Sequence, residues 1–213
     1  MPETRKPPTV VFLVRHGLTP TTGRVLPGRA PGLSLADKGR AQAEAAARRL
    51  AAVPRVAAVY ASPLERARET AAPIARALRV AVRPERGLLE LDIGAWTGQS
   101  LKRASRRPEW AIVQRHPSGF RFPGGESFLE MQTRVVSTLE RLVARHPGQR
   151  IVAVSHADPI KAVLAHALGM HLDHFQRIAI APGSISVIAY HREQPFVLTV
   201  NSIAGDLVPL GLA

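Results

Sequence analysis

The chain has 213 residues and an ordinary hydrophobic fraction of 46%, so we expect residues 1–213 to form a single domain of the larger kind. No apolar run approaches the roughly 18 residues that a membrane span requires, and no signal-peptide pattern opens the chain. We therefore expect a cytoplasmic protein that does not enter a membrane. Cysteine is absent, which excludes disulfides, thiolate nucleophiles and cysteine-based zinc sites.

The chain is strongly basic, with 29 Lys and Arg residues against 16 Asp and Glu residues and a formal net charge of +13. Such an excess can indicate a binder of nucleic acids or of other anions. The arginines, however, are spread through alanine-rich segments, and an aromatic content of 5% leaves few side chains for stacking on bases. This pattern favours a small phosphorylated molecule as the partner over a nucleic acid.

Three short apolar runs predict buried strands at residues 9–14, 56–61 and 150–155. Helical patterns follow them at residues 34–52, with Ser34 as the expected N-cap, and at residues 64–78, 127–146 and 158–168. Residues 178–181, 184–190 and 196–200 are predicted as further strands, and residues 20–32 and 117–125 as loops. The final residues, 205–213, are expected to be only loosely held.

Strands that alternate with helices predict an α/β sandwich, in which ligands gather beyond the carboxyl ends of the strands. The first three predicted strands end at Arg15-His16-Gly17, at Ser62-Pro63 and at Ser155-His156. These polar groups are therefore expected to meet at one edge of the sheet.

The residues at that edge suit phosphate chemistry. The imidazole of His16 can act as a nucleophile toward phosphorus, and Gly17 allows a close approach of the backbone. Arg66 lies at the start of the helix after Ser62, where a guanidinium can hold phosphate oxygens with two parallel hydrogen bonds. Each residue alone could instead be an ordinary loop histidine or a solvated helix arginine.

A second imidazole and several carboxyl groups extend the candidate site. His156 precedes a helix N-terminus, a position that favours bound anions. Glu90 and Asp92 are two residues apart in an expected loop, so one of them could protonate a leaving oxygen, although both could also be surface acids. Glu126 is a secondary candidate, because it could equally cap the helix that follows it.

Taken together, Arg-His-Gly, Ser-Pro-Leu-x-Arg-Ala-x-x-Thr, Leu-x-Glu-x-x-x-Gly-x-Trp-x-Gly and Ser-His, in that order, resemble the histidine phosphatase superfamily. The resemblance covers nearly the whole chain. It implies the phosphoglycerate mutase-like fold, a three-layer α/β/α sandwich with a mostly parallel central sheet.

The resemblance also implies roles for individual residues. His16 would be the nucleophile that becomes phosphorylated, Glu90 the proton donor, and Arg15, Arg66 and His156 the groups around the phosphoryl oxygens. No metal or other cofactor is implied. Further substrate contacts are expected from Gly17, Thr19, Thr22 and Ala157.

The chain departs from many relatives after Arg-His-Gly, where Leu18 replaces a glutamate and Thr22 stands in the place of an asparagine. A threonine hydroxyl has a different reach and number of donors from an amide, so Thr19 or Thr21 could make the phosphate contact instead.

Within the superfamily, residues 92–96 are most similar to the broad-specificity and α-ribazole phosphatases, which favours hydrolysis of small phosphate monoesters. The alternatives are a phosphoglycerate mutase-like phosphomutase and a non-catalytic protein that binds phosphoesters or nucleic acid. The segment that follows the acidic residue in mutases is not found after Glu90. The sequence does not define the substrate, and a homodimer is one possible assembly.

Overall fold

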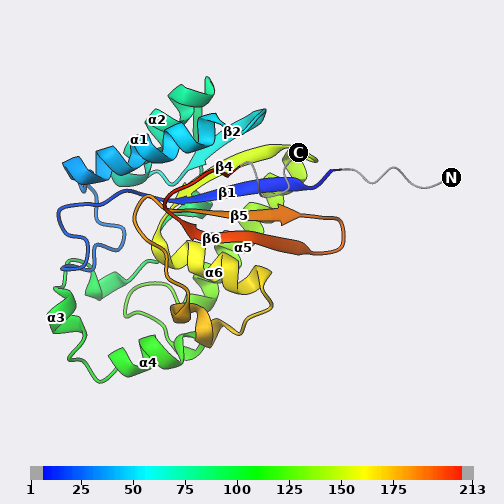
Figure 1. Ribbon diagram of the computed structural model, residues 1–213. Coiled ribbons are helices and arrows are strands. Elements are labelled where there is room, and N and C mark those ends of the chain that lie inside the picture. Colours follow the sequence, from blue (N-terminus) through cyan, green and yellow to red (C-terminus); the bar gives the residue numbers. More distant parts are fainter. Residues whose placement is uncertain (1–6, 208–213) are drawn as a thin grey trace.

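In the computed structural model, which describes residues 7–207, six strands form one mixed sheet (Figure 1). The order across the sheet is β3-β2-β4-β1-β5-β6. The first four of these strands are mutually parallel, β5 pairs antiparallel with β1, and β6 pairs antiparallel with β5. The predicted α/β fold with a mostly parallel sheet is therefore confirmed. The strands are β1 (Thr9–Arg15), β2 (Val56–Ala61), β3 (Val82–Pro84), β4 (Arg150–Ser155), β5 (Ile185–Tyr190) and β6 (Pro195–Ser202).

Helices cover both faces of this sheet and make it the central one of three layers (Figure 1). Helices α1 and α2 pack on one face, and α5 and α6 pack on the other. Within residues 7–207, no helix combines the length and the apolar character needed to cross a bilayer. The helices are α1 (Asp37–Ala51), α2 (Glu65–Leu78), α3 (Leu101–Ala104), α4 (Trp110–Arg115), α5 (Phe128–Arg145) and α6 (Ala157–Ala167), with short 3-10 helices at η1 (Arg86–Leu88), η2 (Gly94–Trp96), η3 (Pro117–Gly119) and η4 (Leu172–Arg177).

Strand β1 shows why the predicted strands are continuous apolar runs. Alternate side chains of a strand point to opposite faces, and both faces of this sheet are covered. Phe12 and Val14 pack in the core beneath α1 and α2, whereas Val11 and Leu13 pack in the core beneath α5 and α6. All four side chains are essentially buried.

Two local predictions are wrong. Helix α1 begins at Asp37 with Ala36 as its N-cap, so Ser34 does not cap it. Residues 178–181 do not form a strand, because side chains bind backbone groups there that strand pairing would otherwise use. Arg15 donates to the carbonyl of Ile180, and the amide of Ala181 donates to the side-chain oxygen of Asn201.

The other predicted helices are confirmed to within a few residues, but strand β3 and the short helices α3 and α4 were not predicted. The start of α5 is defined by Ser127 and Glu130, which form a reciprocal capping box. Of the final segment 205–213, residues 208–213 lie outside the described part of the chain.

The carboxyl ends of β1, β2 and β4 meet at one end of the sheet, because the three strands are adjacent and parallel. Arg15 pairs in register with Ser155, so the residues that follow β1 and β4 leave the sheet side by side. The loop after β1 and the α3–α4 region lie at this same end (Figure 1). The topology thus gathers the predicted site residues.

The backbone after β1 passes unusually close to the start of α1. A Cβ atom on Gly17 would overlap the carbonyl oxygen of Gly39, and a Cβ atom on Gly39 would overlap the carbonyl oxygen of Leu18. Neither glycine has a positive φ, so close packing, and not backbone conformation, requires glycine here. This contact fixes the loop that carries His16.

We predict that Gly39→Ala lowers the free energy of unfolding by about 1–3 kcal/mol, because the added methyl group forces two backbone segments apart. Gly119→Ala is the matched control, since a Cβ atom there would meet nothing within 4 Å. Urea denaturation of both variants measures the difference. Equal stabilities of the two variants would contradict the packing argument.

Candidate active site

His16 lies directly after β1 and is only 5% exposed. Its Nδ1 atom is 2.8 Å from the carbonyl oxygen of Gly17. Since a carbonyl only accepts, Nδ1 carries the proton, and Nε2 keeps a free lone pair. Burial, together with the charges of Arg66 and Arg15, lowers the pKa of His16 to about 3, against a smaller opposing effect of the Gly17 hydrogen bond. The ring is therefore neutral over most of the pH range and keeps a lone pair on Nε2.

Two arginines provide positive charge beside this ring. The Arg66 side chain is fully buried at the start of α2, and its Nη2 donates to the carbonyl of Gly28 at 2.8 Å. Arg15, at the end of β1, donates through Nη1 to the carbonyl of Ile180 at 2.6 Å. Each guanidinium is thus anchored by one nitrogen, and other nitrogens remain for a ligand.

The second imidazole, His156, packs against the first, with ring centroids 5.1 Å apart. Its Nε2 atom is 2.8 Å from the hydroxyl of Ser62, whose oxygen lies 3.5 Å from the amide of Leu64. The hydroxyl can accept from that amide and donate to Nε2, which leaves the proton of a neutral His156 on Nδ1. Burial and the charge of Arg66 lower the pKa of His156 well below its usual value, so the ring is neutral.

Several buried donors at this point have no hydrogen-bond partner among the described residues. They are Nε of Arg15, Nε and Nη1 of Arg66, and Nδ1 of His156. Leaving a buried charged donor unpaired is costly, and an anion is the kind of ligand that can accept from such donors. The arrangement is therefore a candidate phosphate site next to the free Nε2 of His16.

Glu90 provides an acid at the edge of the same site. One of its carboxylate oxygens accepts from the amide of Leu91, and the other lies 4.0 Å from Nδ1 of His156. Burial and the nearby charge of Asp158 raise the pKa of Glu90 to about 7, despite the opposing charges of Arg66 and Arg15. Near neutral pH the carboxyl group can therefore both give and accept a proton.

The loop after Gly17 contains a cluster of hydroxyl groups. The Thr22 hydroxyl accepts from the amide of Thr19 at 3.0 Å and lies 2.9 Å from the Thr19 hydroxyl. The Thr21 hydroxyl is 3.3 Å from that of Thr19. Contacts of Thr19 and Thr22 with a substrate stay predictions, because in this structure the hydroxyls bind one another.

Gly17 and Ala157 have different surroundings from each other. The amide of Gly17 donates to the Thr70 hydroxyl, and its carbonyl accepts from His16, so its backbone groups are engaged within the protein. Ala157 is the first residue of α6, where amide groups have no partner inside the helix. A substrate contact is thus better supported for Ala157 than for Gly17.

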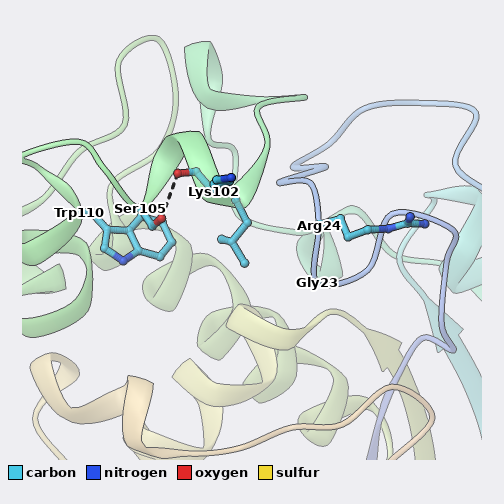
Figure 2. A pocket seen from close by; sticks show the side chains of 6 residues that line it. Gly23, Arg24, Lys102, Ser105 and Trp110 are labelled. Atoms are coloured by element: carbon cyan, nitrogen blue, oxygen red, sulfur yellow. Dashed lines mark hydrogen bonds between the residues drawn. The ribbon is translucent and has the colours of Figure 1, made fainter.

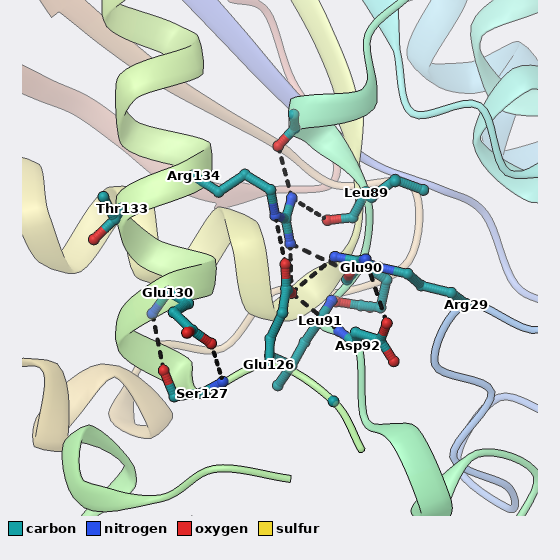
Figure 3. A network of polar contacts seen from close by, with 12 residues as sticks. Arg29, Leu89, Glu90, Leu91, Asp92, Glu126, Ser127, Glu130, Thr133 and Arg134 are labelled. Atoms are coloured by element: carbon teal, nitrogen blue, oxygen red, sulfur yellow. Dashed lines mark hydrogen bonds and ion pairs between the residues drawn. The ribbon is translucent and has the colours of Figure 1, made fainter. Parts of the chain in front are cut away.

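An ion-pair cluster holds the segment that carries Glu90 (Figure 3). Glu126 forms a two-point ion pair with Arg134 of α5 and a third contact with Arg29. Glu126 therefore does not cap α5, which Ser127 does. Asp92 lies at the rim of this cluster, 3.5 Å from Arg29.

Sequence reasoning missed Arg29, Arg134 and Thr70 as members of this region and did not anticipate the contact of Ser62 with His156. Ser62 and Thr70 are the first and last residues of the Ser-Pro-Leu-x-Arg-Ala-x-x-Thr motif, which could have identified them as members of the site. Arg29 and Arg134 belong to none of the motifs, so only their contacts in the folded chain identify them.

A separate cavity of about 510 Å³ lies between the loop after β1 and α3–α4 (Figure 2). The loop is joined to this region by the amides of Leu26 and Leu101, which donate to Gln99 and Arg24 respectively. Trp110 and Ser105 lie on one side of the cavity and Arg24 on the other (Figure 2). The lining residues are Gly23, Arg24, Leu101, Lys102, Ser105 and Trp110, which include two cations and no acid.

Comparisons with known proteins agree with this fold. Residues 11–203 match the model of the histidine phosphatase superfamily (branch 1). The chain belongs to this superfamily and has its phosphoglycerate mutase-like fold.

Individual relatives are similar over most of the chain. The bifunctional protein Rv2228c of Mycobacterium tuberculosis is 36% identical over 192 residues, which are 89% of this chain and 52% of that protein. The chain thus spans about half the length of this mycobacterial relative. Phosphoserine phosphatase 1 of Hydrogenobacter thermophilus is 31% identical over 187 residues, which are 82% of this chain and 84% of that protein. The solved structure of the alpha-ribazole phosphatase from Shigella flexneri has a TM-score of 0.80 at 25% identity and covers 92% of this chain and 97% of its own.

The electrostatics of Glu90 predict a specific titration. Because the negative charge of Asp158 disfavours ionised Glu90, Asp158→Asn should lower the pKa of Glu90 from about 7. Infrared spectroscopy of the protonated carboxyl band, with Glu90→Gln to assign it, measures the midpoint. Asp37→Asn, which removes an exposed acid from the first turn of α1, is the control and should leave the midpoint unchanged. A midpoint unaffected by Asp158→Asn would rule out this coupling.

Proposed function

We propose that this protein is a metal-independent phosphatase that hydrolyses small phosphate monoesters through a phosphohistidine on His16. One observation carries the proposal: a buried, neutral His16 with a free Nε2 lies beside the unpaired donors of Arg15, Arg66 and His156. Phosphoryl transfer needs an in-line nucleophile and stabilisation of the charge on three equatorial oxygens, and these groups supply both.

In the first step, Nε2 of His16 attacks phosphorus, and the bond from phosphorus to the ester oxygen breaks. Arg15, Arg66 and His156 hold the three equatorial oxygens. Glu90 gives its proton to the leaving oxygen, so the alcohol departs neutral and Glu90 becomes a carboxylate. The hydrogen bond from Nδ1 of His16 to Gly17 keeps the ring in the reactive tautomer.

In the second step, water attacks the phosphohistidine. The Glu90 carboxylate takes a proton from this water, the phosphorus–nitrogen bond breaks, and inorganic phosphate and neutral His16 are released. A pKa near 7 suits Glu90 to both roles. The proton balance closes, because the proton lost in the first step is regained in the second.

Similarity to phosphoserine phosphatase 1 and to an alpha-ribazole phosphatase supports hydrolysis over transfer to a second alcohol. A phosphomutase has to return the phosphoryl group to a bound product and keep water away. Product analysis separates the two: release of inorganic phosphate supports the phosphatase, and isomerised phosphoester without free phosphate supports the mutase.

We predict that His16→Ala lowers the turnover of p-nitrophenyl phosphate by at least about 10³-fold, because the covalent route is lost. The wild-type rate should be unchanged by EDTA. His166→Ala, at an exposed position on α6, is the control and should keep full activity.

Two results would contradict this assignment. Undiminished turnover in His16→Ala would exclude the phosphohistidine. A wild-type protein that binds phosphate without turnover would instead support a non-catalytic phosphoester-binding protein. Wild-type enzyme that is trapped during turnover of a 32P-labelled substrate should carry a 32P label that acid releases. The absence of this label from His16→Ala identifies the intermediate directly.

The cavity beside α3 supports a further proposal about the substrate. We propose that the alcohol part of the substrate lies in this cavity and carries a second negative charge. Arg24 and Lys102 line this cavity and no acidic side chain does. Trp110 adds an apolar surface, and it stacks at 6.4 Å on the buried Trp96. Such a surface fits a phosphorylated carboxylic acid better than a phosphoester whose alcohol part has no charge.

We predict that Lys102→Glu raises the KM for 3-phosphoglycerate about 3- to 10-fold and leaves its kcat unchanged, because charge repulsion at an exposed site weakens binding alone. The KM for p-nitrophenyl phosphate should change little. Arg145→Glu changes the net charge equally at the end of α5, away from the cavity, and is the control. Equal changes in KM for both substrates would exclude a specific role of the cavity.

A further inference from the structure

The segment from Gly87 to Asp92 carries Glu90 but has little regular structure of its own. Only its first two residues belong to the 3-10 turn η1, and the remaining four have no helical or strand pairing. The position of the Glu90 backbone therefore depends on whatever binds the free backbone groups of this segment.

Two guanidinium groups bind these backbone groups (Figure 3). Arg134 reaches from α5 and donates through Nη1 to the carbonyls of Gly87 and Leu89, at 2.8 and 3.0 Å. Arg29 donates through Nε to the carbonyl of Glu90 at 2.8 Å, and Nη2 of Arg134 lies 3.4 Å from the same oxygen. The carbonyl of the acidic residue is thus held from two sides.

Glu126 joins the two guanidiniums into one unit. Its carboxylate accepts from Nε and Nη2 of Arg134, both at 2.9 Å, and lies 2.8 Å from Nη2 of Arg29. It also accepts from the amide of Asp92 at 3.1 Å, while its own amide donates to the carbonyl of Asp92. The segment is therefore fixed on both sides of Glu90.

The cluster is well shielded from water, which strengthens its hydrogen bonds. The side chains of Arg29, Glu126 and Arg134 are 26%, 20% and 22% exposed. Burial alone would raise the pKa of Glu126, but the hydrogen bonds and charge of Arg134 outweigh it and hold the pKa below its usual value. The carboxylate thus stays ionised and keeps both arginines in place.

The same loop also connects the acid to the phosphate site. Gly28, next to Arg29, accepts from Nη2 of the buried Arg66 at 2.8 Å. The backbone of Gly28 thus binds Arg66 of the proposed phosphate site, and the side chain of the next residue, Arg29, binds the Glu90 backbone. The Gly28-Arg29 stretch therefore links the position of the Arg66 guanidinium to that of the Glu90 backbone.

We propose that Glu126 and Arg134, together with Arg29, are positioning residues that set the Glu90 carboxyl group against the leaving oxygen of the substrate. This proposal rests on the proposed function, and it extends that function to residues that touch no reacting atom. Their contacts are with the backbone on either side of Glu90.

Leaving-group dependence tests the proposal. An alkyl phosphate such as β-glycerophosphate needs a proton on the departing oxygen, whereas p-nitrophenolate leaves readily as an anion. The value of kcat/KM reports the step that phosphorylates His16, in which Glu90 acts as the acid. Arg134→Met should lower kcat/KM for the alkyl phosphate about 10- to 100-fold more than for p-nitrophenyl phosphate.

A double-mutant cycle separates positioning from a general structural role. If Arg134 acts through Glu90, Arg134→Met should cost little further on the alkyl phosphate once Glu90→Gln is present. Arg76→Met breaks an arginine–glutamate ion pair between α2 and α1 and is the matched control, with equal effects on both substrates. Equal losses on both substrates in Arg134→Met, or a full additional loss in the Glu90→Gln background, would overturn the proposal.

Glu126→Gln keeps the shape of the cluster and serves if Arg134→Met does not fold. It should show the same preference for the nitrophenyl ester, about 3- to 10-fold, because a neutral amide holds the arginines less strongly. An equal loss of kcat/KM on the alkyl phosphate and on p-nitrophenyl phosphate in this variant would overturn the proposal as well. If Glu90→Gln lowers kcat/KM equally on both substrates while His16→Ala is inactive, then Glu90 is not the acid. The positioning role then fails, but the proposed phosphohistidine on His16 stands.

Discussion

The fully buried guanidinium of Arg66 and the partly buried one of Arg15, at the carboxyl end of a parallel sheet, are the constraint on which the rest of the site depends. Arg66 is fully buried, and each of its hydrogen-bonding nitrogens except Nη2 has no partner among the described residues. A buried cation with unpaired donors is unstable unless a negative group completes its surroundings, and Glu90, the carboxyl group that acts most strongly on Arg66, has a pKa raised toward neutrality. A bound phosphoryl group would complete the site.

These charges also fix the protonation states of their neighbours. Burial and the arginines hold the pKa of both imidazoles low, so that His16 stays neutral while it lies in a cationic site. Burial and Asp158 act in the opposite direction on Glu90 and raise its pKa. A neutral His16 and a protonated Glu90 can therefore coexist near neutral pH, because their two environments separate their pKa values.

The site combines two ways of holding side chains. Arg15 ends β1, and His16 and His156 directly follow β1 and β4. The ladder between these two strands fixes the relative positions of the three residues. Glu90 instead lies on an irregular segment whose backbone is bound by side chains from distant parts of the chain. Backbone pairing thus positions the residues of β1 and β4, whereas an ion-pair cluster positions Glu90.

The sequence by itself determined the apolar runs of the central strands and the polar groups at their ends, because a strand buried on both faces leaves a local signature. It predicted His16, Arg66, His156 and Glu90 as one set through their motifs. It failed at Ser34 and at residues 178–181, where local patterns suggested a cap and a strand but contacts with distant residues decided the outcome.

Only the tertiary structure decided which donors are left unpaired, which nitrogen of His16 is free, and what Glu126 binds. Hydrogen-bond partners and pKa values depend on burial and on charges brought together from separate elements, and no local pattern records them. Arg29 and Arg134, for example, lie 105 positions apart in the chain and meet on one carboxylate.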